Sequence, residues 1–115
     1  MHTELHTTFG EEQVRDALRD VYDPELPVNI VDLGLIYRVD VAPDPDAPGF
    51  VPRYCVAIEI TMTSQGCPSH AVIIEKVQNR LAGIREISRV DMRLVWEPPW
   101  HPRLISETAR KQLGI

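Results

Sequence analysis

Cys67 is the residue best placed to do chemistry. The segment from Thr61 to Pro68 has the pattern of a strand that breaks into a turn and leads into a helix. Proline suits the first helical position, so Cys67 is expected at or beside the helix N-cap. Free backbone N–H groups and the helix dipole favour a thiolate there, which makes a cysteine reactive or able to bind metal. The alternative is a small buried cysteine that happens to precede a proline.

The sequence does not supply a complete metal site around Cys67. It contains no C-x-x-C motif, and Cys55 lies on the preceding expected strand. His70 falls on the same helical turn as Cys67 and is a weak second ligand, although an exposed first-turn histidine is the commoner explanation. A complete zinc or cluster site within one chain is therefore not expected, and a labile or shared site, completed by a second subunit or a client, needs fewer ligands per chain.

A second constellation precedes the first expected strand, between Asp23 and Gly34. Asp23 and Asp32 can each cap a turn, and Pro24 and Pro27 stiffen the backbone. That structural explanation gives no role to Glu25. Glu25 could be an acid-base group or a ligand if the fold brings it near Cys67.

A third constellation is the stretch from Glu97 to Pro102. Such a proline-rich stretch is usually an extended connector that packs its tryptophan, here Trp100, onto the domain. We favour this interpretation over a ligand role for His101. The sequence has no Gly-rich phosphate loop, G-x-S-x-G or H-E-x-x-H, so hydrolase and nucleotide chemistry find no support.

Composition limits the classes of protein. The 115 residues carry a net charge of -5, with a pI near 5.3 and scattered basic residues, which argues against nucleic acid as a partner. No apolar run approaches the roughly 20 residues that span a bilayer, and the amino terminus lacks a signal-peptide pattern. We expect one domain over residues 1–115, located in the cytoplasm, with Cys55 and Cys67 as free thiols.

Periodicity and prolines assign the elements that must position these residues. Apolar residues at helical spacing predict a first helix over Glu11–Tyr22, with Thr8 and Glu11 as a capping box. Alternation predicts strands over Leu33–Val41, Arg53–Thr63 and Ser88–Trp96. The proline-rich segment Ala42–Pro52 is expected to be a loop joining two antiparallel strands.

The same patterns assign faces. The first strand is expected to bury Leu35, Tyr37, Val39 and Val41; the second, Tyr54, Val56, Ile58, Ile60 and Met62; the third, Val90, Met92, Leu94 and Trp96. A second helix should start at Pro68, bury Ile74, Val77 and Leu81, and stop at Gly83, and a closing helix should carry Ile105, Ala109 and Leu113. The order α-β-β-α-β-α predicts an α+β domain with helices on one face of a three-stranded mixed sheet.

Three separated motifs resemble the SufT-like metal-sulfur cluster assembly family, related to the cytosolic iron-sulfur targeting factor and to PaaD. They are the D-P-E-L-P-V-N-I-V-D-L-G-L-I-Y run that starts at Asp23, the T-M-T and G-C-P of 61–68, and the tail from Pro98 to Arg110. The resemblance implies a fold similar to the carboxy-terminal domain of NifU-type scaffolds. It also implies a role in maturing iron-sulfur proteins, without enzymatic turnover. With so few ligands in one chain, we then expect a transient iron or iron-sulfur cluster and no tightly bound cofactor.

The resemblance also implies roles for individual residues. The family's functional thiol matches Cys67, and its D-P-E signature, thought to lie near that thiol, matches Asp23, Pro24 and Glu25. Thr61 and Thr63 match a polar strand end that would hydrogen-bond around the sulfur. The sequence departs from the family at Ser69, His70 and His101, and it lacks the cysteine-rich extension of PaaD-type members, which favours the SufT-like assembly role.

Three functional hypotheses follow. The favoured one is an accessory factor that assembles or transfers iron-sulfur clusters through Cys67, with the assembly machinery and client apoproteins as partners and a homodimer as an option. The second is a thiol enzyme with Cys67 as nucleophile and Glu25 or His70 as its base. The third is a protein-binding adaptor that uses the proline-rich loop or Trp100 as a docking surface.

Overall fold

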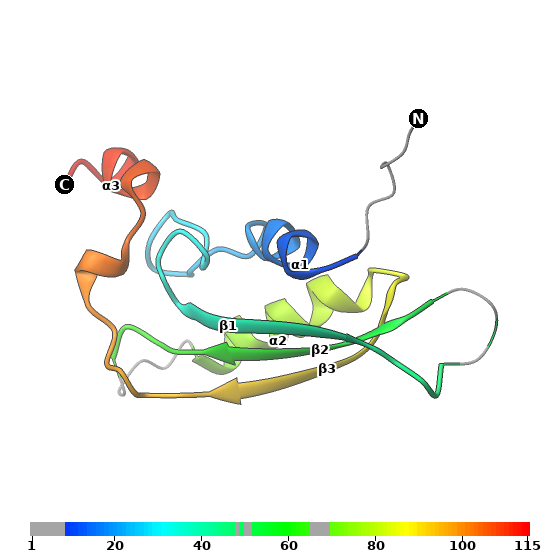
Figure 1. Cartoon of the computed structure of the whole chain (residues 1–115). Helices are drawn as coiled ribbons and strands as arrows, with labels where there is room; N and C mark the ends of the chain where they lie inside the picture. Colours follow the sequence, from blue (N-terminus) through cyan, green and yellow to red (C-terminus); the bar gives the residue numbers. More distant parts are fainter. Residues whose placement is uncertain (1–8, 48, 50–51, 65–69) are drawn as a thin grey trace.

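The chain folds as the α-β-β-α-β-α order predicts. The structure, a computed structural model, describes residues 9–47, 49, 52–64 and 70–115. Its elements in order are α1 (Glu11–Leu18), β1 (Ile36–Pro43), β2 (Tyr54–Ile60), α2 (His70–Ala82), β3 (Ile87–Leu94), a short 3-10 helix η2 (Pro102–Leu104) and α3 (Glu107–Leu113). Figure 1 shows α3 carried on the carboxy-terminal tail, away from the centre of the sheet.

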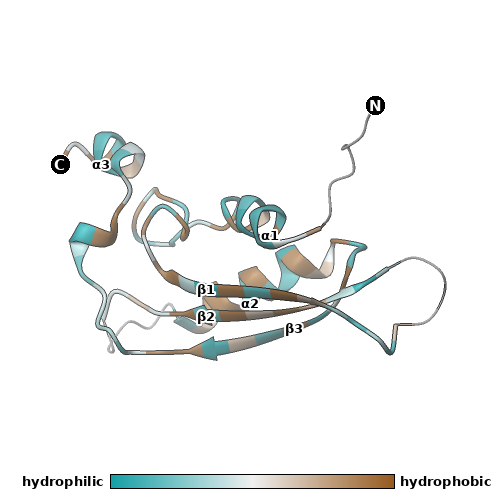
Figure 2. Cartoon of the chain, viewed as in Figure 1, coloured by the Kyte–Doolittle hydropathy of each residue, from teal (hydrophilic) through white to brown (hydrophobic). Residues whose placement is uncertain are grey.

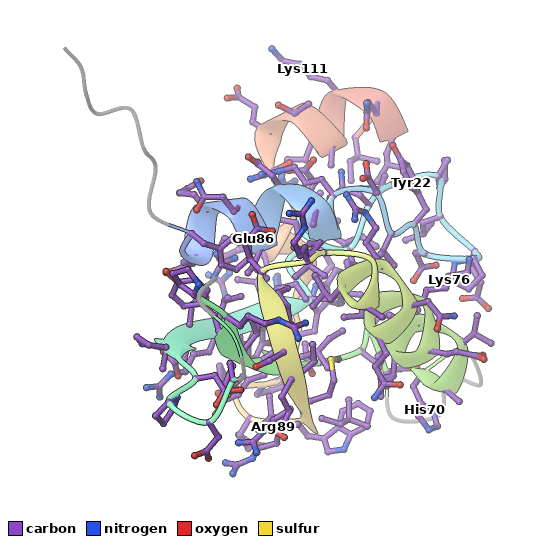
Figure 3. The ribbon with its side chains drawn as sticks, turned by 90° about the vertical axis from the view of Figure 1, so that its right-hand side faces the viewer. Tyr22, His70, Lys76, Glu86, Arg89 and Lys111 are labelled. Carbon is purple, nitrogen blue, oxygen red and sulfur yellow. The ribbon has the colours of Figure 1, made fainter. Side chains whose placement is uncertain are left out.

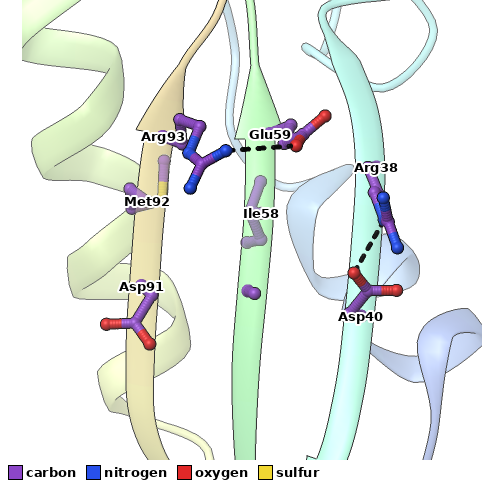
Figure 4. Close-up of a pocket in the computed structure, with 8 residues that line it drawn as sticks. Arg38, Asp40, Ile58, Glu59, Asp91, Met92 and Arg93 are labelled. Carbon is purple, nitrogen blue, oxygen red and sulfur yellow. Dashed lines mark ion pairs between the residues drawn. The ribbon is translucent and has the colours of Figure 1, made fainter.

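The sheet is mixed, as expected. Its strand order is β1-β2-β3, with β1 antiparallel and β3 parallel to the central strand. The parallel pair requires a crossover, which α2 supplies. Helices α1 and α2 cover the same face of the sheet (Figure 1). No helix of the described residues covers the other face, which Figure 4 shows with both helices behind it. The expected α+β class with helices on one face is therefore confirmed.

The hydrophobic core lies between this helix pair and the sheet (Figure 2). Much of it comes from a segment without regular secondary structure, the connection between α1 and β1. Val28, Ile30, Leu33 and Leu35 in this connection are all fully buried. The large buried side chains of the helices and strands that join them are Leu18, Ile58, Ile60, Ile73 and Leu81. The connection is thus part of the core.

The first helix is shorter than predicted. It ends at Leu18, and the chain continues as turns to Val21, which is still buried. The Val21 carbonyl accepts a hydrogen bond from the Ile30 N–H at 2.9 Å, so the chain here pairs with the following loop. The helix starts at Glu11 as predicted, but its N-cap is Gly10, whose N–H donates to Gln13 Oε1 at 2.8 Å. The predicted cap Thr8 lies outside the described residues.

The first strand starts later than predicted and runs into the expected loop, since Ala42 and Pro43 belong to β1. Its register shifts between Ile36 and Arg38, which marks a bulge. The extra residue reverses the alternation locally. Ile36 is therefore buried and Tyr37 is only half-buried, the opposite of the prediction for these two positions.

The remaining elements need smaller corrections. Helix α2 is described from His70, it ends at Ala82, and it buries Ile73 instead of Ile74. Strand β2 ends at Ile60, before the predicted Thr63. Strand β3 exposes Arg89, Asp91 and Arg93 as predicted, but its inward residues are only half-buried because β3 is an edge strand. Trp96 lies beyond its end.

A polar network fixes the end of the sheet at which β2 begins. The Ser88 hydroxyl donates to Asp44 Oδ2 at 2.6 Å, and the Arg53 guanidinium donates to the carbonyls of Arg85 and Ile87. The hydrogen bond from Ser88, followed by that from the Asp46 N–H, lowers the pKa of the Asp44 carboxyl below its usual value. The ionised carboxylate thus helps to hold the start of β3 against the hairpin.

This network predicts a pH-dependent contribution to stability. A lowered folded-state pKa means that Asp44 stabilises the fold above its unfolded pKa of about 4, and that this contribution is lost as pH falls through the folded-state pKa. Asp44→Asn should lower the urea midpoint at pH 7, and the gap from wild type should shrink at about pH 3. Asp46→Asn is the matched control, and an equal effect of both variants at pH 7 would contradict the assignment.

Candidate functional site

The expected functional thiol, Cys67, lies outside the described residues, so the site is built from its described flanks. On one side, β2 ends at Ile60 and the chain continues through Thr61. The Thr61 N–H donates to the Leu35 carbonyl at 2.8 Å, and the Ile60 carbonyl accepts from the Val95 N–H at 2.8 Å. The base of the Cys67 segment is therefore held from both neighbouring segments of chain.

Thr61 has an unusual environment. Its side chain is completely buried, and its hydroxyl Oγ1 makes no hydrogen bond within the described part of the chain. Leaving a buried hydroxyl without a partner costs about 1–3 kcal/mol. Thr63, two positions later, is half-buried. Among the described residues Thr61 is thus a buried donor without a partner at the base of the Cys67 segment, which singles it out among the predicted supporting residues.

On the other side, His70 is the first described residue of α2 and is exposed (Figure 3). It lies at the end of the helix that is nearer to Cys67 in sequence. Among residues 9–47, 49, 52–64 and 70–115, no three His, Cys, Asp or Glu side chains gather closely enough to hold a metal ion. Within the same ranges, none of the helices has the length and apolar character to cross a membrane.

Asp23 organises the turn that it begins. Its side chain is 9% exposed, and its Oδ1 accepts hydrogen bonds from the N–H groups of Glu25 at 2.7 Å and Leu26 at 3.0 Å. Asn29 acts similarly, since its Oδ1 accepts from Val31 and Asp32. The turn-capping interpretation of Asp23 thus matches the structure. Glu25 is exposed on this turn, and its distance from Cys67 falls outside what is described.

The first and third signature motifs contact each other, which the sequence alone did not predict. The Trp100 indole N–H donates to the Leu33 carbonyl at 2.8 Å, and the Ser106 N–H donates to the Asp32 carbonyl at 2.8 Å. Between these bonds the chain passes very close to Gly34, where an added Cβ would lie 2.6 Å from both the Cβ and the carbonyl oxygen of Leu104. The tail therefore clamps the loop before β1.

The packing of the tail on the loop also explains the roles of two tail residues, Trp100 and His101. Trp100 is half-buried and its indole N–H is hydrogen-bonded, which confirms that it packs the connector onto the domain. Less of its surface is therefore exposed for the docking role that the adaptor hypothesis gives it. His101 Nδ1 accepts a hydrogen bond from the Arg103 N–H at 3.0 Å and so caps η2. Nδ1 therefore already has a hydrogen-bond partner, and His101 has a structural role as the cap of η2.

Cys55 lies on β2 and is half-buried. Its Sγ is 4.0 Å from the Ser88 hydroxyl, and it is a free thiol. It stands at the opposite end of β2 from Thr61. Cys55 therefore serves as an internal control for experiments on Cys67.

The comparisons with known proteins define the class. The family model described as "Iron-sulfur cluster assembly protein" matches residues 11–92. This range takes in the loop from Asp23 to Gly34, the Thr61 strand end and the segment that carries Cys67. The chain belongs to this family of iron-sulfur cluster assembly proteins.

Individual relatives agree with the SufT-like resemblance. The chain is 41% identical over 105 residues to an Fe-S protein maturation auxiliary factor of Porphyromonas gingivalis, covering 91% of each protein. It is 40% identical over 95 residues to the Fe-S protein maturation auxiliary factor SufT of Staphylococcus aureus, covering 83% of this chain and 98% of SufT. A solved domain of unknown function from Bacillus anthracis superposes with a TM-score of 0.76 at 37% identity, covering 91% of this chain and 92% of that one.

The Gly34 contact predicts a specific loss of stability. Gly34 has φ +82, a conformation that costs about 1–2 kcal/mol for an L-residue, and the clash with Leu104 adds to that cost. Gly114 also has a positive φ of 75, but a Cβ added there would meet nothing within 4 Å. Gly34→Ala should therefore lower the urea midpoint clearly more than Gly114→Ala does. Equal effects would contradict the close packing of the tail on the loop.

Proposed function

We propose that this protein assists the assembly of iron-sulfur clusters or their transfer to client proteins, and that Cys67 is the thiol through which it acts. The observation that carries the proposal is the position of Cys67 in a family-matching motif, in a chain about 40% identical to maturation auxiliary factors. The cluster or its iron is cargo in this proposal, and the protein does not catalyse turnover of a metabolite.

The chemistry of the proposal is thiolate ligation. Cysteine thiolates are the usual ligands of iron-sulfur clusters. A single thiolate from this chain leaves the other coordination positions of the metal to ligands of a client or of the assembly machinery. Such partial ligation suits release, because the client's full set of ligands binds the cargo more tightly than one sulfur does. The cytoplasm is the compartment that we propose, since it keeps such thiols reduced.

Thr61 is the supporting residue that the structure favours most. Its buried hydroxyl is a donor without a described partner, at the base of the segment that carries Cys67. We infer that it donates to the Cys67 sulfur and favours the thiolate, which would relieve the cost of the buried hydroxyl. Asp23 would act indirectly, by holding the turn that presents Glu25.

The thiol-enzyme alternative makes a different demand on Glu25. As a general base for Cys67 it would have to come within hydrogen-bonding reach of the sulfur or of a bridging water. Glu25 is exposed, and no hydrogen bond to its carboxylate is described. The assembly role requires no such base, and we therefore favour it.

The first test replaces Cys67. Cys67→Ser should lose cluster binding on anaerobic reconstitution with iron and sulfide, measured by visible absorption and iron analysis. It should also fail to support activation of an apo client such as an aconitase. Cys55→Ser is the matched control and should behave like wild type. If Cys67→Ser binds cluster and activates the client as well as wild type does, the proposed role of Cys67 is wrong.

The second test replaces Thr61. Thr61→Val should cost little stability, because valine keeps the volume and no described residue loses a hydrogen bond. If that hydroxyl bonds the thiolate, its loss should raise the pKa of Cys67 by roughly one to two units, since such a hydrogen bond is worth about 1.5–3 kcal/mol. The pKa of Cys67 is obtained from the rate of iodoacetamide alkylation at a series of pH values. Each protein carries Cys55→Ser, so that alkylation reports on Cys67. Thr63→Val is the control, and an unchanged pKa in Thr61→Val would refute the assignment.

A further inference from the structure

A groove lies where the carboxy-terminal tail passes the end of the sheet, and the proposal for Cys67 uses none of the residues that line it. We call it the tail groove. It has a volume of about 490 Å³. Its apolar walls come from Ile36 and Tyr37 of β1 and from Pro98 and Leu104 of the tail, and its charged members include Glu59 and Glu97. Leu104 is 44% exposed, an unusual exposure for a large apolar side chain here.

The tail groove continues onto the open face of the sheet. A second hollow of about 370 Å³ lies over the three strands, and it shares Arg38 and Glu59 with the tail groove. Figure 4 shows these two side chains at one end of that hollow, on the face opposite to α1 and α2. The two hollows therefore adjoin at Arg38 and Glu59.

The walls of the tail groove are fixed before anything binds. The Tyr37 hydroxyl donates to the Pro98 carbonyl at 2.8 Å, which ties β1 to the tail across the groove. The close packing of Leu104 on Gly34 sets the position of the second apolar wall. The bulge at Tyr37 turns this ring away from the core. A preformed groove loses little conformational entropy on binding.

The charge on the rim of the tail groove is negative. Arg38 is already paired with Asp40 at 2.7 Å. Glu59 has only a long contact of 3.9 Å to Arg93, and Glu97 makes no ion pair with any described residue. The charge of Glu97 acts in the groove, since burial and then this carboxylate raise the pKa of Tyr37. An incoming cation would therefore meet Glu97 with no competing ion pair among the described residues, and at Glu59 it would compete with Arg38 and Arg93, which stand opposite Glu59 on the two neighbouring strands.

We propose that the tail groove binds a short segment of a partner protein in which a bulky apolar side chain stands next to a lysine or arginine. The apolar side chain would pack on Leu104, Pro98 and Ile36. The neighbouring cation would reach Glu59 and Glu97. That this partner is an iron-sulfur client or assembly protein rests on the proposed function, but the binding chemistry of the groove does not.

The test is a nuclear magnetic resonance titration of the full-length, ¹⁵N-labelled protein at low salt. The probe is the peptide acetyl-Gly-Ser-Leu-Arg-Ser-Gly-amide, and its counterpart carries Glu in place of Arg. The Arg peptide should shift the amides of Tyr37, Glu59 and Leu104 and bind about fivefold or more tightly than the Glu peptide. Double substitution of Glu59→Gln and Glu97→Gln should weaken the Arg peptide about fivefold, the fold-change that corresponds to about 1 kcal/mol.

Glu86→Gln is the matched control. Glu86 is an exposed carboxylate just before β3, at the other end of the sheet (Figure 3), and this variant should bind like wild type. Equal binding of the two peptides, no binding of either, or a Glu59/Glu97 variant that matches the control would each overturn the proposal. Cys67→Ser should bind the Arg peptide as wild type does, so a failed role for Cys67 and a failed groove give separate results.

Discussion

The close approach of the carboxy-terminal tail to Gly34 is the contact on which most of the molecule depends. It holds the loop before β1, and that loop supplies Ile30, Leu33 and Leu35 to the core. The Leu35 carbonyl in turn accepts the hydrogen bond from Thr61 that anchors the base of the Cys67 segment. The same approach sets the Leu104 wall of the tail groove. The absence of a side chain at Gly34 thus affects the core, the base of the Cys67 segment and the tail groove together.

The regular elements were predictable because they repeat. Periods of two and of 3.6 residues placed the strands and helices, and prolines separated them. The predictions failed where a single local interaction outweighed the period. The bulge at Tyr37 exchanged the environments of two neighbouring residues, and the pairing of Val21 with Ile30 ended α1 early. Such contacts join residues that no local pattern relates.

The features of the candidate site were likewise predictable only where they depend on local sequence. Asp23 as a turn cap and Trp100 as a packed connector could be inferred from residue type and spacing, because their bonding is local or needs only one obvious donor. The burial of the Thr61 hydroxyl could not, since it depends on how β1, β2 and the chain after β3 meet. The contacts between the loop and the tail also join residues that are distant in sequence. The one sequence signal for them was Trp100, whose indole N–H needs a hydrogen-bond acceptor when it is buried.

The parallel pairing of β2 with β3 has a further consequence for work on this protein. Because the two strands are parallel, they end at the same end of the sheet, where Thr61, Glu97 and the tail groove lie. Pro43 and Tyr54, which flank the connection between β1 and β2, lie at the other end. β2 has seven residues, and at a rise of about 3.3 Å per residue the two ends of the sheet are roughly 20 Å apart. A fluorescent reporter inserted into that connection would therefore stand at the end of the sheet opposite to Thr61 and the tail groove.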